Sequence, residues 1–139
     1  MINKTKIRKL LETSKTKLLK NEPIDPTYFI KPRSKKNPIL IFSPSWNSPE
    51  SKASVFEELR RVCNLVDAKQ VTMVSDCNLH GDDLSFSDGL CVTVEEAERF
   101  QMVLLPYTRN PEGEIVFDKE LWENRKTKHP EALSEGLVQ

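Results

Sequence analysis

The chain has 139 residues, which is enough for one domain with a short appendage. It is 37% hydrophobic and 30% charged, a composition typical of a globular protein with a modest core. No apolar run approaches the roughly 20 residues that cross a bilayer, and the first residues lack the apolar core of a signal peptide. We therefore expect a cytoplasmic protein.

The net charge of zero hides an uneven distribution along the chain. Residues 1–36 hold eleven Lys or Arg and three Asp or Glu, a net charge of +8, and the remainder carries −8. This asymmetry predicts a basic arm attached to an acidic body.

Residues 1–22 are predicted to form a basic amphipathic helical arm. Over residues 4–20 one face of the predicted helix carries Ile7, Leu10, Leu11, Leu18 and Leu19. Lysine and arginine cover the rest of the helix, and we take three of them as candidate partner-binding residues: Lys6, Arg8 and Lys9. Two interpretations remain open. The arm could dock through its leucines on its own body or on a second copy, or it could bind an anionic polymer.

Residues 23–37 are predicted to be a proline-rich basic linker, because proline at this density favours extended chain. Tyr28 and Phe29 are predicted to fix it to the body, although aromatic side chains among basic residues can also stack on single-stranded bases. The candidate partner-binding residues in this segment are Lys31, Arg33, Lys35 and Lys36.

Residues 38–126 are predicted to form a single domain that begins with a β-α-β unit. Residues 39–42 and 71–74 are short apolar runs typical of buried strands. Between them, Ser48, Pro49 and Glu50 are typical of a helix start, and apolar residues recur at helical spacing over 49–66. If the two strands are parallel, the loops that follow them leave the same edge of the sheet, where such sheets tend to bind ligands.

The second half of this domain is predicted to end in a β-hairpin. Residues 81–92 are expected to be loop, and 93–99 a short helix that starts with a capping-box pattern. Residues 100–107 and 114–117 are predicted to pair across a turn at 110–113. A last helical turn is expected at 120–126, followed by a flexible tail at 127–139. The predicted class is α+β: a small mixed sheet, one main packing helix and an N-terminal basic helix.

One stretch resembles a group of known proteins. It contains Thr72-Met-Val-Ser-Asp, a polar loop, the run from Glu95 to Leu105 and a Pro-Glu-Gly turn. Over residues 50–118 this order is similar to small uncharacterised phage and prophage proteins, in which a helix leads into a strand and an acidic, arginine-containing stretch feeds a second strand and hairpin. The resemblance implies a phage origin, a host-cytoplasmic location and a fold, but no mechanism.

The densest group of potential ligands follows the second predicted strand. Asp76, His80, Asp82 and Asp83 offer the oxygen and imidazole ligands of a divalent metal site. Cys77 could instead act as a nucleophile with His80 as its base. The structural alternative, which we favour, is that these are turn residues at a strand end.

The three cysteines form no Cys-x-x-Cys pair, which argues against a disulfide framework and a cysteine-rich zinc site. Cys63 falls on the apolar stripe of the main predicted helix and is expected to be a core residue. Trp46, in the loop before that helix, would suit a partner-binding surface if it is exposed.

We interpret the chain as a non-enzymatic accessory or interaction protein that binds a host or phage macromolecule. A protein partner or self-association is favoured, nucleic acid remains open through the basic arm, and no cofactor is expected. The alternative is a small metal-dependent hydrolase or nuclease that uses Asp76, His80, Asp82 and Asp83. At least three of these side chains must converge on one point for that alternative to hold.

Overall fold

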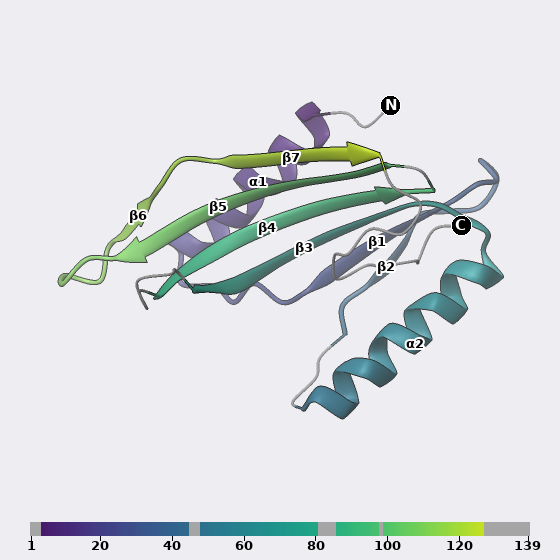
Figure 1. Cartoon of the computed structure of the whole chain (residues 1–139), viewed down its shortest axis with the longest axis horizontal. Coiled ribbons are helices and arrows are strands. Elements are labelled where there is room, and N and C mark those ends of the chain that lie inside the picture. The colour runs from purple at the N-terminus through teal and green to yellow at the C-terminus, as the bar shows by residue number, and fades with distance from the viewer. Residues whose placement is uncertain (1–3, 45–47, 81–85, 98, 127–139) are drawn as a thin grey trace.

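The computed structural model describes the chain except for residues 1–3, 45–47, 81–85, 98 and 127–139. Two helices and seven strands follow one another: α1 (Lys4–Leu19), β1 (Thr27–Pro32), β2 (Leu40–Phe42), α2 (Pro49–Leu65), β3 (Ala68–His80), β4 (Phe86–Glu96), β5 (Arg99–Arg109), β6 (Ile115–Phe117) and β7 (Leu121–Lys126). They form one α+β unit with an N-terminal helix and a main packing helix, as predicted (Figure 1).

The strands form one sheet in the order β2-β1-β3-β4-β5-β6, and β7 also pairs with β5. All the strand pairs are antiparallel, so the sheet is not mixed. β2 and β3 still point the same way, because β1 lies between them and is antiparallel to both. The loops that follow β2 and β3 therefore leave the sheet at the same end, as the predicted β-α-β unit required.

Helix α1 lies against one face of the sheet. Its buried side chains Ile7, Leu11, Ser14 and Leu18 recur at helical spacing and pack with residues of β3, β4 and β5. The helix ends where Asn21 adopts a positive φ of 59°. There the Asn21 and Glu22 N–H groups donate to the carbonyls of Leu18 and Lys17, the pattern of a Schellman C-cap.

Helix α2 lies on the opposite side of the sheet and begins as the sequence predicted. The Ser48 hydroxyl accepts a hydrogen bond from the Ser51 N–H, and the Ser51 hydroxyl accepts one from the Ser48 N–H. Two side chains of this helix, Leu59 and Cys63, are buried and pack with Tyr28, Val71 and other core residues on this side of the sheet. The prediction that Cys63 is a core residue is therefore confirmed.

Three local predictions in the second half of the domain are wrong. Much of the expected loop at 81–92 and most of the expected helix at 93–99 belong to β4, and the expected helical turn at 120–126 is β7. The capping-box pattern that begins at Thr93 also suits a strand, and pairing with β3 and β5 on both sides favours the strand. β7 is likewise held by its pairing with β5, which brings Trp122 beside Val103. The predicted hairpin of β5 and β6 is confirmed.

The proline-rich segment at 23–37 contains β1, which the sequence did not indicate. β1 pairs with β2 on one side and with β3 on the other. Tyr28 is fully buried in the core beneath α2, and Phe29 packs on the α1 side. The two aromatic side chains thus fix this segment to opposite faces of the sheet, which makes it part of the domain.

Candidate functional site

The two predicted metal ligands that the structure describes, Asp76 and the backbone of His80, belong to the last part of β3. Asp76 is an exposed residue of β3 opposite Leu90, and His80 is the last residue of that strand. Asp82, Asp83 and the side chain of His80 lie outside the described residues. Within the described ranges, no three His, Cys, Asp or Glu side chains lie close enough together to hold a metal ion.

The electrostatic environment of this end of the sheet is acidic. Although Asp76 is an exposed residue, the protein around it desolvates its carboxyl in part, and this raises its pKa. The negative charges of Asp88 and Asp25 raise the pKa further, whereas a backbone hydrogen bond lowers it. The half-buried Cys77 thiol also has a raised pKa, first because of burial and then because of Asp76 and Asp88. A raised thiol pKa reduces the thiolate fraction, which is the opposite of what a cysteine nucleophile requires.

The basic candidate residues fall into two separate groups. Lys6 and Lys9 are exposed on α1, whereas the Arg8 Nη1 lies 3.0 Å from the Glu120 Oε2 and its guanidinium stacks over the Trp122 ring. Lys4 and Lys15 of α1 likewise lie over the rings of Trp122 and Phe117. Several cations of α1 therefore help to hold the helix on the strands β6 and β7.

The second basic group surrounds the turn between β1 and β2, at the opposite end of the sheet from Asp76 (Figure 1). Lys31, Lys35 and Lys36 are exposed there, and the Arg33 Nε lies 3.2 Å from the Asp67 Oδ2. Trp46 lies outside the described residues. The predicted partner-binding residues thus do not form one continuous site.

The structure instead presents a free sheet edge at β2. No other strand of the described chain pairs with the outer side of β2. Ile39 is 50% exposed and Ile41 is 67% exposed, although the sequence predicted a buried strand here. An edge strand without charged side chains is a ready site for pairing with another strand.

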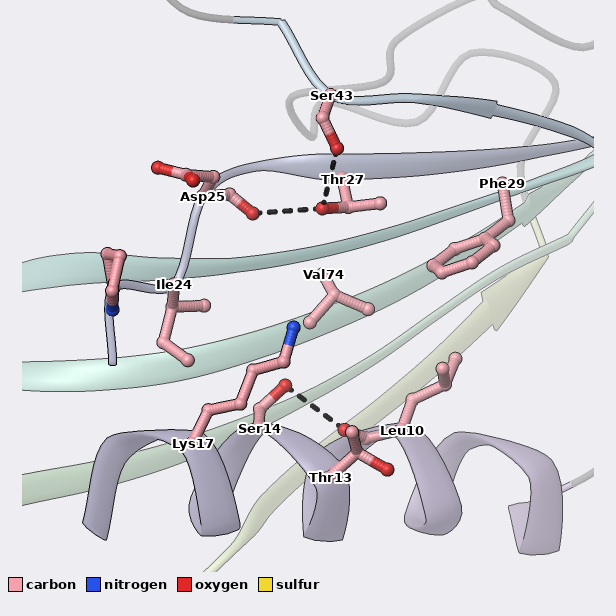
Figure 2. A pocket seen from close by; sticks show the side chains of 11 residues that line it. Leu10, Thr13, Ser14, Lys17, Ile24, Asp25, Thr27, Phe29, Ser43 and Val74 are labelled. Carbon is pink, nitrogen blue, oxygen red and sulfur yellow. Dashed lines mark hydrogen bonds between the residues drawn. The ribbon is translucent and has the colours of Figure 1, made fainter. Parts of the chain in front are cut away.

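A groove lies beside this edge, between α1 and β1, and we call it the α1–β1 groove (Figure 2). It has a volume of about 230 Å³. Its residues come from α1, the α1–β1 connection, β1, β3 and the position directly after β2: Leu10, Thr13, Ser14, Lys17, Pro23, Ile24, Asp25, Thr27, Phe29, Ser43 and Val74. Phe29 is the cross-strand partner of Ile41, so the groove and the exposed edge form one continuous surface.

One sequence pattern is compatible with this surface, although it also predicts a buried strand. The run from Ile39 to Ser43 lies between Pro38 and Pro44 and contains no charge. Such a run fits a buried strand and an exposed edge equally well, because the distinction depends on the order of strands in the sheet.

Comparison of the chain with known proteins found no matching family model, no matching curated protein and no matching solved structure. Neither helix of the described chain has the length and apolar character needed to span a membrane.

Proposed function

We propose that this chain is a non-enzymatic accessory protein that binds a protein partner along the free edge of β2. The observation that carries the proposal is the exposure of Ile41 on β2 and of Ile39 directly before it, at an edge strand whose outer side no described strand pairs with. Exposed apolar side chains grouped at a free edge are typical of a binding surface rather than of a solvated one. In strand addition, the partner's backbone supplies hydrogen bonds and its alternate side chains supply specificity.

The prolines at the two ends of β2 limit the length of the proposed contact. Pro38 and Pro44 lack the N–H group that a strand ladder requires, so five residues, 39–43, are available between them. A partner segment of similar length would pair there, and its remaining contacts would come from the α1–β1 groove. The proposed interaction is therefore that of a short extended peptide segment.

A protein partner explains this surface better than a nucleic acid does. Ile7, Leu11 and Leu18 of α1 are buried on the chain's own sheet, and Arg8 is engaged with Glu120, so part of the basic arm has a structural role. The exposed isoleucines offer nothing to a phosphate backbone, whereas they suit an apolar peptide. The resemblance of residues 50–118 to phage and prophage proteins supports a phage origin, with a host or phage protein as the partner.

A capture experiment with matched variants tests the proposal. The full-length chain, Ile41→Lys and Leu65→Lys would each be used as bait in a lysate of the native host cells. Leu65 is the matched control because it is an 80% exposed apolar residue that belongs to α2 and not to β2. We expect a protein that is retained by the wild type and Leu65→Lys and is lost from Ile41→Lys.

Equal retention by both variants would place the binding surface elsewhere and refute the proposal, as would the absence of any retained protein for a chain that is also monomeric. Sedimentation of the purified wild type and Ile41→Lys identifies the partner's source. A dimer that dissociates in Ile41→Lys makes the partner a second copy of this chain.

A further inference from the structure

We infer that the α1–β1 groove binds a carboxylate side chain from the partner's extended segment, and that Lys17 is the residue that recognises it. This inference rests on the proposed function, because it assigns the chemistry of the segment that adds to β2. It follows from the charge, the hydrogen bonding and the size of the groove.

The groove contains one cation that the described part of the chain does not neutralise. Lys17 extends from α1 into the space between the helix and the sheet, whereas the carboxylate of Asp25 is turned away from that space (Figure 2). No ion pair joins Lys17 to a described acidic residue; the other lysine near it on α1, Lys15, pairs with Glu12. An anionic group entering the groove would therefore gain a charge-assisted hydrogen bond.

The hydroxyl groups of the groove are already engaged within the chain. The hydroxyls of Thr13 and Ser14 donate to the carbonyls of Lys9 and Leu10, and the Thr27 hydroxyl donates to the Asp25 carbonyl. Their protons are thus not available to an incoming ligand in this arrangement. Recognition of an anion consequently depends on the Lys17 ammonium.

The remaining walls are apolar, and the space is small. Leu10, Ile24, Phe29 and Val74 line it, which favours an occupant with an aliphatic stem and a charged end. The volume of about 230 Å³ lies below the roughly 300–1,000 Å³ of typical small-molecule sites. A glutamate or aspartate side chain beside an apolar residue suits both the size and the chemistry of the groove.

The position of the groove links it to the free edge. Ser43, which directly follows β2, lines the groove, and its hydroxyl lies 3.1 Å from that of Thr27. A segment added along β2 passes Ile41 and its cross-strand neighbour Phe29 on the same face. Because alternate side chains of a strand share a face, an acidic residue next to an apolar one on that face can occupy the groove.

The test is a selection of displayed random 12-residue peptides on four forms of the full chain: wild type, Lys17→Glu, Ile41→Lys and Lys20→Glu. Lys20 is the matched control because it is an exposed lysine just after α1 that does not line the groove. Thermal melts of the four proteins establish that each is folded. Lys17 and Lys20 are both exposed residues, so neither charge reversal is expected to disturb the core.

We expect the wild type and Lys20→Glu to select peptides rich in β-branched residues with Asp or Glu among them. Lys17→Glu should lose the acidic preference and select Lys or Arg instead. A synthetic acidic peptide from the wild-type pool should bind Lys17→Glu at least about 10-fold more weakly, the loss typical of a hydrogen bond to a charged group.

The other outcomes separate the two proposals. Peptides that require Ile41 but bind wild type and Lys17→Glu equally would overturn the role of Lys17 and leave strand addition at β2 intact. Failure to select any peptide above background, or pools that are insensitive to both variants, would overturn both. Displacement of the acidic peptide by a 20-nucleotide oligothymidylate, with a steep salt dependence, would assign Lys17 to nucleic-acid binding instead.

Discussion

The packing of α1 on the sheet predicts a large difference between two leucines of the same helix. Leu11 is 0% exposed in the core between α1 and the sheet, whereas Leu19 is 60% exposed. Leu11→Ala removes three carbon groups, worth about 0.8 kcal/mol each in transfer free energy, or about 2.4 kcal/mol. The cavity that remains raises the expected loss of unfolding free energy to about 3–4 kcal/mol.

The matched variant Leu19→Ala makes the same chemical change on the exposed side and should alter the unfolding free energy by less than about 0.5 kcal/mol. Urea denaturation followed by circular dichroism measures both variants, with the slope of the transition as a check that unfolding remains two-state. Equal, near-zero effects would mean that α1 is an arm detached from the body in solution. That result would refute the assignment of Ile7, Leu11 and Leu18 to the core, and with it the α1 wall of the groove.

Three further predictions concern the acidic end of the sheet and the cysteines. Asp76→Asn should raise the unfolding free energy at neutral pH, because partial burial raises the folded-state pKa of Asp76 above 3.8 and the wild type loses stability as the pH rises from 3.8 through that raised pKa. The gain should vanish below pH 3.8, and urea titrations that give an equal gain at neutral pH and below pH 3.8 would contradict this cause. Burial raises the pKa of Cys63 to about 11 and of Cys91 to about 12, so Cys77 should react first with Ellman's reagent in the folded protein; three equally fast thiols would contradict the burial. Calorimetry with magnesium, manganese and zinc should show no binding tighter than millimolar, and tight binding that Asp76→Asn abolishes would establish the metal site instead.

The parts of the fold that the sequence predicted are those encoded locally. The bounds of α2 follow from the capping pattern at Ser48 and from the apolar stripe that contains Leu59 and Cys63. Helix α1 similarly follows from its own leucines and ends at Asn21. In both helices, residues three or four apart in sequence are neighbours in space, so a periodic pattern is sufficient.

The parts that could not be predicted depend on contacts between distant segments. The stretch beginning at Thr93 suits a helix start or a strand, and its pairing with β3 and β5 decides the outcome. The prolines on both sides of β1 obscured it, and its pairing with β2 and with the distant strand β3, at Val71 and Met73, is what defines it.

The candidate binding surface was missed for the same reason. The sequence predicts a strand at residues 39–42, but only the strand order places β2 at the edge and leaves Ile41 exposed. The α1–β1 groove likewise joins Lys17 to Phe29 across a turn, a proximity that no residue spacing encodes. The potential metal ligands near Asp76, in contrast, are adjacent in the sequence, so residue types and spacing alone are enough to predict a candidate site there.

Hydrogen–deuterium exchange along the backbone tests the central claim most directly. The exchange of the wild-type chain would be compared with and without the partner, or the peptide, that depends on Ile41. Strand addition predicts slowed exchange of those amides of residues 39–43 that point away from β1, because the partner's carbonyls accept hydrogen bonds from the free edge of β2. The residues that line the groove should show smaller protection. Protection confined to the exposed lysines of α1 or to the end of the sheet near Asp76, with β2 unchanged, would contradict the account.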